Sequence, residues 1–204
     1  MTLSVRNLTI SRGGLPLLEC VSIDVPAGEA LILRGPNGVG KTSLLRTLAG
    51  LQEAEAGEID ADPDELLYAS HADGVKSQLT VVENLTFWAE VYGQTVPEEV
   101  YEHFELADLK SRLAGTLSAG QKRRLGLARL GVINRKVLLL DEPTVSLDQV
   151  SVKRFASFLQ TTHLAAGGSA LIATHIDLGL DAPTYDLSQN IAAPTPLDQD
   201  EAFL

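Results

Sequence analysis

A glycine-rich segment near the N-terminus has the composition of a phosphate-binding loop. Residues 35–42 read Gly-Pro-Asn-Gly-Val-Gly-Lys-Thr and match the pattern G-x-x-x-x-G-K-[ST]. An apolar stretch at 30–34 predicts a buried strand before the loop, and apolar spacing over 42–51 predicts a helix after it. Backbone N–H groups at such a strand–turn–helix junction converge on one point and bind an anion.

The loop therefore predicts a nucleotide triphosphate site. We expect Lys41 to reach the β- and γ-phosphates and the Thr42 hydroxyl to bind Mg²⁺. A glycine turn that binds nothing is the alternative, which the flanking strand and helix disfavour. The residues expected to contact ATP here are Gly35, Pro36, Asn37, Gly38, Val39, Gly40, Lys41 and Thr42.

Two adjacent carboxylates follow a second apolar strand at 137–140. Asp141 and Glu142 stand at the carboxyl end of that strand, where open α/β sheets place their ligands. We expect Asp141 to bind Mg²⁺, partly through water, and Glu142 to act as the base that activates the attacking water. Two acids that only cap the next turn are the alternative, and the phosphate loop disfavours it.

A third segment, Leu-Ser-Ala-Gly-Gln at 117–121, lies between these two. Its S-x-x-Q spacing from Ser118 to Gln121 predicts a capping box that opens a helix over 121–130. A capped helix N-terminus also suits a γ-phosphate, because it offers free N–H groups and the positive end of the helix dipole. Since the chain already has a phosphate loop, a second anion-binding helix end suggests the nucleotide of a partner chain.

With these segments in this order, the chain resembles the nucleotide-binding subunits of ABC transporters over residues 3–187. The segment at 117–121 differs from the family signature L-S-G-G-Q only at Ala119. The resemblance implies a homodimer in which Ser118 and Gly120 of one copy face the γ-phosphate bound by the other. It also assigns a D-loop to 146–148 and makes His175 the switch histidine, which contacts the γ-phosphate and the attacking water.

Two positions depart from the family pattern. The glutamine that contacts the metal shell in the family falls at His71, whose neutral ring could contact Mg²⁺-bound water; an ordinary loop histidine is the alternative. The aromatic residue that stacks on adenine is replaced near Arg12. Its guanidinium plane could stack on the base, or it could be a solvated turn residue.

The resemblance implies an α/β fold: a P-loop NTPase core of ABC-ATPase type with an antiparallel β edge and an inserted α-helical subdomain. We expect one ATP-binding domain over 1–187, with the helical subdomain at about 74–130. Alternating polar and apolar residues at 3–10 and 20–25 predict the antiparallel strands. The acidic, proline-containing residues 188–204 predict a flexible tail.

Composition limits the function classes. A net charge of −11 over 204 residues disfavours a nucleic-acid-binding surface, and we expect no nucleic-acid partner. Cys20 is the only cysteine, which excludes an internal disulfide, and no apolar run approaches the length of a membrane span. Direct haem binding is not expected, because C-x-x-C-H is absent and the four histidines are scattered.

Three segments, 71–85, 114–130 and 173–180, are similar within the family to the ATPase subunits of cytochrome c maturation systems. That similarity implies an ATPase on the cytoplasmic face of the inner membrane, bound peripherally through an integral membrane permease and haem-handling membrane proteins. Its turnover would drive haem export or release of a haem chaperone. A soluble or other-cargo ABC ATPase, a small-metabolite P-loop kinase and a binding module without turnover remain as alternatives.

Overall fold

The computed structural model describes residues 3–193, and its centre is a five-stranded sheet in the order β5-β6-β7-β3-β8. Every neighbouring pair is parallel. The middle strands are buried on both faces except at Arg34, which is why their sequences are continuous apolar runs. The strands are β3 (Ala30–Arg34), β5 (Leu66–Ala69), β6 (Val137–Asp141), β7 (Ser169–Ala173) and β8 (Thr184–Asp186).

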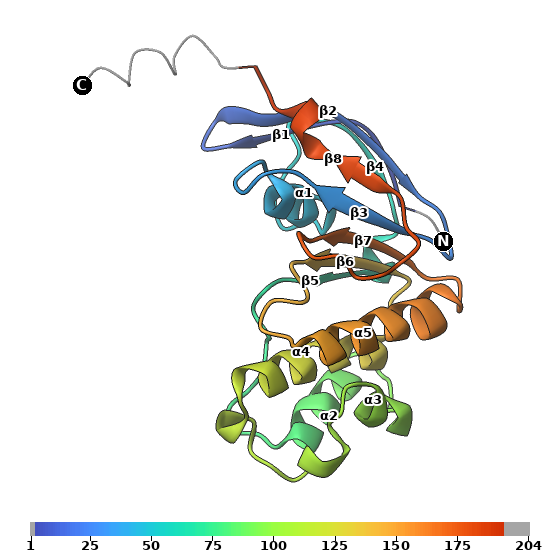
Figure 1. The fold of residues 1–204 in the computed structure, drawn as a ribbon. Coiled ribbons are helices and arrows are strands. Elements are labelled where there is room, and N and C mark those ends of the chain that lie inside the picture. The colour runs from blue at the N-terminus through green and yellow to red at the C-terminus, as the bar shows by residue number, and fades with distance from the viewer. Residues whose placement is uncertain (1–2, 194–204) are drawn as a thin grey trace, which may run out of the picture.

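A second, antiparallel sheet covers one face of the first. In it β1 (Leu3–Arg12) pairs with β2 (Leu15–Val25) on one side and β4 (Ala56–Asp60) on the other. Helix α1 (Lys41–Leu48) lies between the two sheets, and its leucines share one apolar core with both (Figure 1). The predicted antiparallel edge is therefore present, and it packs the phosphate-loop helix against the parallel sheet.

The other face of the parallel sheet is covered by helices. Helix α4 (Ala119–Ile133) and helix α5 (Gln149–Phe158), which continues into a π-helical segment at Leu159–Leu164, pack on the sheet, with α2 (Val81–Val91) and α3 (Glu98–His103) beyond them (Figure 1). These helices share a second apolar core with the sheet. Single-turn helices lie at Pro63–Glu65, Ala107–Leu109, Ala114–Thr116 and Leu187–Asn190.

The predicted capping box at Ser118 is confirmed, and a second capping box is found at Thr80. Thr80 begins α2, with its Oγ1 accepting from the Glu83 amide at 3.2 Å and its own amide donating to the Glu83 carboxylate at 2.7 Å. Ser118 begins α4 in the same way, with Gln121 at 3.2 Å and 2.9 Å. Each pair satisfies two amides that the helix itself leaves free, so the start of α4 is fixed by its own sequence.

Residue 188, the predicted start of the flexible tail, lies too early in the chain. Residues 187–190 form a helical turn, and the buried Asn190 side chain donates to the carbonyls of Glu19 at 3.0 Å and Cys20 at 3.2 Å. These bonds attach the segment to β2, because a buried amide needs such partners. The remainder of the predicted tail, 194–204, lies outside the described residues.

Candidate nucleotide site

The phosphate loop lies between β3 and α1 and borders a cleft of about 360 Å³. Its conformation requires glycine at Gly40, where φ is +114° and a Cβ would lie 3.0 Å from Leu18 Cδ1. The antiparallel sheet thus packs directly on the loop. The cleft is lined by Arg12, Leu17, Asn37, Gly38, Gly40, Lys41, Thr42, Ser43, Asp141 and Glu142.

Lys41 is almost buried, with 8% of its surface exposed. Its Nζ donates to the carbonyls of Gly35 at 2.8 Å and Pro36 at 3.2 Å, and lies 3.1 Å from His175 Nε2. The ammonium is therefore held over the loop by groups that carry no net charge. A phosphate oxygen in the cleft would give it a stronger, charge-assisted hydrogen bond.

Thr42 and Asp141 meet at the floor of the cleft. The Thr42 hydroxyl donates to Asp141 Oδ2 at 2.8 Å, although the residues are 99 positions apart. A hydroxyl and a carboxylate oxygen are ligands that suit Mg²⁺ beside phosphates. Within residues 3–193 there is no cluster of three acidic, histidine or cysteine side chains that could hold a metal ion. The Thr42–Asp141 pair supplies two such oxygen ligands, which fits an ion whose other ligands are phosphate oxygens and water.

Tyr68 is a site residue that the sequence analysis missed. It lies on β5, next to β6, and its hydroxyl donates to Asp141 Oδ2 at 3.2 Å. Burial, with the charge of Asp141 as the second cause, raises the pKa of Tyr68 to about 12. The phenol therefore stays a neutral donor at physiological pH and helps to fix the carboxylate. No motif contains it, and its only sequence signal was its place on a strand beside β6.

Glu142 and His175 come together because β6 and β7 are parallel neighbours. Asp141 pairs with Ala173 at the ends of these strands, and the Glu142 amide donates to the Ala173 carbonyl at 2.8 Å. Glu142 Oε1 then lies 3.6 Å from His175 Nε2. The backbone of Glu142 has φ +47°, a left-handed conformation that is unfavourable for a glutamate. Lys41, Glu142 and His175 thus converge on one place.

Arg34 is a second residue that the sequence analysis missed. It ends β3 immediately before the phosphate loop, and its guanidinium donates to the carbonyls of Thr174 and, at 3.2 Å, Ile176. Since these residues flank His175, Arg34 holds the histidine segment beside the loop.

Ser118 and Gly120 do not line the phosphate-loop cleft. They border a separate hollow of about 250 Å³ together with Ser146 and Asp148. A Cβ on Gly120 would lie 3.2 Å from the Ser146 carbonyl, so glycine allows the two segments to approach closely. The hollow and the cleft share no residue. One chain therefore presents two distinct parts of the predicted site.

Arg12 and His71, the two residues that depart from the family pattern, lie in different parts of the structure. Arg12 lines the cleft, on the side where β1 ends, and its stacking on adenine stays a prediction. The His71 side chain is exposed and does not line the cleft with Thr42 and Asp141, and its predicted contact with the metal shell stays a prediction. The His71 side chain lies outside the cleft because its loop runs along α4, where the His71 carbonyl accepts from Arg123 Nη1 at 3.2 Å.

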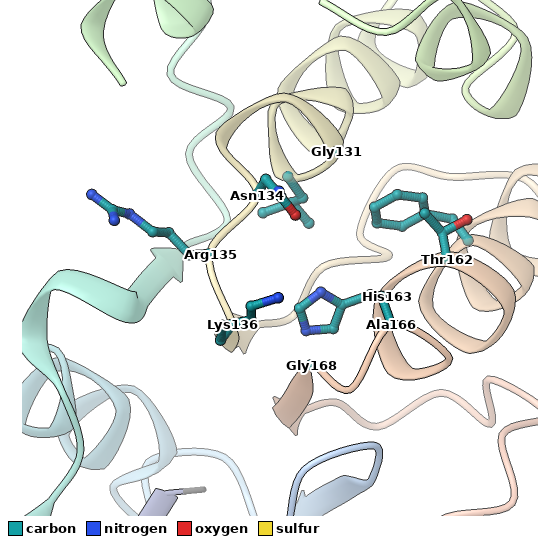
Figure 2. Close-up of a pocket in the computed structure, with 10 residues that line it drawn as sticks. Gly131, Asn134, Arg135, Lys136, Thr162, His163, Ala166 and Gly168 are labelled. Carbon is teal, nitrogen blue, oxygen red and sulfur yellow. The ribbon is translucent and has the colours of Figure 1, made fainter. Parts of the chain in front are cut away.

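A small cavity lies at the opposite edge of the parallel sheet (Figure 2). It is formed where α4 ends and where the chain enters β6 and β7, and its volume of about 50 Å³ is too small for a nucleotide. His163, which borders it, hydrogen-bonds the Ser169 carbonyl through Nε2 at 3.0 Å. None of the predicted nucleotide-site residues lines this cavity.

The geometry agrees with comparisons to known proteins. A family model described as ABC transporter matches residues 18–145. The Cytochrome c biogenesis ATP-binding export protein CcmA of Roseobacter denitrificans is 59% identical over 207 residues, covering 100% of both chains. This chain belongs to the ABC transporter family, among its cytochrome c biogenesis ATP-binding export proteins.

Further relatives support this assignment. The protein of the same name from Paracoccus denitrificans is 60% identical over 178 residues, covering 87% of this chain and 84% of the relative. A solved putative ABC transporter ATP-binding protein from Pyrococcus furiosus has a TM-score of 0.84 at 26% identity, covering 94% of this chain and 100% of that one. The predicted family, fold class and ABC-type ATPase class are confirmed. Within residues 3–193, no helix has the length and apolarity needed to cross a membrane.

Proposed function

We propose that this chain is the ATP-hydrolysing subunit of an ABC transporter complex for c-type cytochrome biogenesis. Its turnover would drive haem export or release of a haem chaperone on the far side of the membrane. Support for hydrolysis comes from the convergence of the Lys41, Glu142 and His175 side chains beside the Thr42–Asp141 pair. The cytochrome c assignment is supported by the names of full-length relatives at 54–60% identity.

Each cleft residue has a role in this proposal. The loop amides and Lys41 bind the β- and γ-phosphates. Thr42 and Asp141 would hold Mg²⁺, which when bound neutralises charge on those phosphates. Glu142 orients and deprotonates the attacking water, and His175 contacts the γ-phosphate and that water. Arg12 stacks on the base.

The active form in this proposal is a head-to-tail homodimer. Each nucleotide is bound by the phosphate loop of one copy and by Ser118 and Gly120 of the other. Two observations support it: the start of α4 lies in a hollow separate from the cleft, and the capping box engages the Ser118 and Gln121 amides but not those of Ala119 and Gly120. ATP closes the dimer by contacting both copies, and hydrolysis removes that shared contact.

We further propose that the dimer is bound to the cytoplasmic face of the inner membrane through an integral membrane permease and haem-handling proteins. The test is complementation of a bacterium that lacks its own relative of this chain. The wild-type chain should restore covalent haem in c-type cytochromes, whereas Lys41→Ala should not. The b-type cytochromes of both strains serve as the control for haem supply.

Two results would redirect the proposal. If c-type cytochromes are not restored by an expressed chain that hydrolyses ATP, another cargo or a soluble role replaces cytochrome biogenesis. If the purified chain releases no phosphate without an added acceptor, ATP hydrolysis itself is wrong.

A further inference from the structure

Arg123 is a buried cation that joins two segments of the site. Only 4% of its surface is exposed, and it lies on α4 two residues after the capping glutamine. Its Nε donates to the Pro143 carbonyl at 2.8 Å and its Nη2 to the Glu142 carbonyl at 3.0 Å. Nη1 contacts the loop after β5, where the acceptors are Ser70 O at 3.1 Å, His71 O at 3.2 Å and Asp73 Oδ1 at 3.1 Å.

The Arg123 guanidinium makes more hydrogen bonds than are needed to neutralise its buried charge. One carboxylate would suffice to pair the guanidinium, and Asp73 provides it. The other acceptors are all backbone carbonyls, two of them at Glu142 and Pro143. A fixed planar fork that spans two segments is something arginine can supply and lysine cannot.

The bond to Glu142 acts on a strained residue. Glu142 has φ +47°, and its amide is bound to Ala173 at 2.8 Å while its carbonyl is bound to Arg123. Such a conformation is unfavourable for a residue with a side chain and persists only where the surroundings impose it. The direction of the Glu142 carboxylate therefore depends on the two hydrogen bonds that hold its peptide groups.

The loop is also fixed to α4 by close packing. A Cβ at Gly126 would lie 2.8 Å from the Asp73 carbonyl and 3.0 Å from its Cα, so this face of α4 has no space to spare. One further turn along, Arg129 lies over the Trp88 ring at 5.5 Å and against Gly74. Residues 123, 126 and 129 thus hold the loop at 70–74 along one helical face.

We propose that Arg123 is a positioning residue for Glu142, which couples the His71 loop and α4 to the placement of the catalytic carboxylate. The inference rests on the proposed role of Glu142 as the base. Because α4 begins at Ser118, the same side chain also connects Glu142 to the helix whose start faces the partner's nucleotide. A displacement of the loop or of the helix would then change the direction of the base.

The test compares Arg123→Lys with Arg154→Lys in the full-length chain. Arg154 is half exposed and, among residues 3–193, forms an ion pair with Glu105 alone, at 3.1 Å, so the second variant controls for loss of a guanidinium. We expect Arg123→Lys to lower kcat about tenfold, which corresponds to about 1.4 kcal/mol of barrier. The KM for ATP and the fraction of chains that bind a fluorescent ATP analogue should not change, since the cleft does not contain Arg123. Arg154→Lys should match wild type.

A double mutant separates positioning from general stabilisation. If Arg123 acts through Glu142, Arg123→Lys should cause no further loss of single-turnover phosphate release in a Glu142→Gln background. The proposal is overturned if Arg123→Lys lowers phosphate release by the same factor in the Glu142→Gln background as in wild type. It is also overturned if the kcat of Arg123→Lys, per nucleotide-binding chain, equals that of wild type. Normal turnover of Glu142→Gln alone would instead reject the proposed role of Glu142.

Asp73→Asn gives a second variant should Arg123→Lys fail to fold. It replaces the carboxylate that pairs with Nη1 by a neutral amide at a part-exposed position and leaves α4 unchanged. We expect a smaller drop in kcat in the same direction, again absent in the Glu142→Gln background. A kcat equal to wild type would count against coupling between the loop and the base.

Discussion

Lys41 Nζ and His175 Nε2 lie 3.1 Å apart, although 134 positions separate the residues in the chain. An ammonium can only donate, so Nε2 must be the acceptor in this pair. The His175 ring is then neutral with its proton on Nδ1. In the proposed mechanism Lys41 turns to the phosphates and no longer donates to Nε2. The His175 proton can then move from Nδ1 to Nε2, which lets Nε2 donate to the γ-phosphate.

This relationship predicts the tautomer of His175. Nitrogen NMR of the chain without nucleotide should show the proton on Nδ1, and addition of a non-hydrolysable ATP analogue should change the Nε2 signal as Lys41 turns to the phosphates. Lys41→Met removes the donor and should abolish the initial preference. A wild-type ring with its proton on Nε2 would contradict the assignment.

Glu142→Gln should lower ATP turnover by about 10²-fold or more, a few kcal/mol of barrier, because an amide cannot accept the proton of the attacking water. ATP binding uses the loop and should persist, so ATP-dependent dimers should accumulate. Phosphate release and size-exclusion chromatography measure the two effects. Glu58→Gln, an exposed change on β4, is the matched control. Wild-type turnover in Glu142→Gln would remove the residue from its role.

Arg12→Ala should weaken ATP binding about two- to fivefold, as expected from loss of about 0.5–1 kcal/mol when an exposed cation leaves a π-face. Arg6→Ala changes another exposed arginine of β1, which pairs with Asp24 at 2.7 Å, and should leave affinity unchanged. Titration calorimetry with ATP and with inorganic triphosphate distinguishes base from phosphate contacts. Equal losses for both ligands would show that Arg12 binds phosphate rather than adenine.

His163 should make the fold sensitive to mild acid. Burial lowers the pKa of His163 from its usual 6.5, although its bond to the Ser169 carbonyl opposes the shift. Below pH 6.5 His163 is therefore protonated more readily in the unfolded chain than in the folded chain. The free energy of unfolding falls as the pH drops towards the folded-state pKa.

Urea unfolding at a series of pH values measures this effect. His163→Gln should lose less stability than wild type on acidification, because glutamine can donate to Ser169 without titrating. His71→Gln, which changes an exposed ring, is the control. If the free energy of unfolding depends on pH in the same way for wild type and His163→Gln, the prediction is contradicted.

Most of the features that could be predicted from the sequence are encoded by residues that lie next to one another in the chain. The phosphate loop, the strand before Asp141 and the capping box at Ser118 are each encoded by consecutive residues, and glycine, apolar runs and S-x-x-Q spacing have direct geometric meaning. Parallel pairing of β6 with β7 then follows from the fold class, and it brings Glu142 to His175.

Contacts between distant segments could not be predicted in this way. Tyr68, Arg34 and Arg123 act through partners 19 to 142 positions away, on strands, helices or loops whose contacts no local pattern reveals. The placement of His71 could not be predicted for the same reason, since its loop packs on α4. The tail boundary failed because polar composition does not reveal that one buried amide, Asn190, can attach a segment to β2.

The left-handed backbone of Glu142 has an evolutionary consequence. Glycine at this position would relax the peptide and favour folding, yet it would remove the carboxylate. Selection for thermal stability therefore favours glycine at position 142, whereas selection for turnover favours glutamate. Libraries of this chain screened for heat resistance alone should drift there towards inert variants.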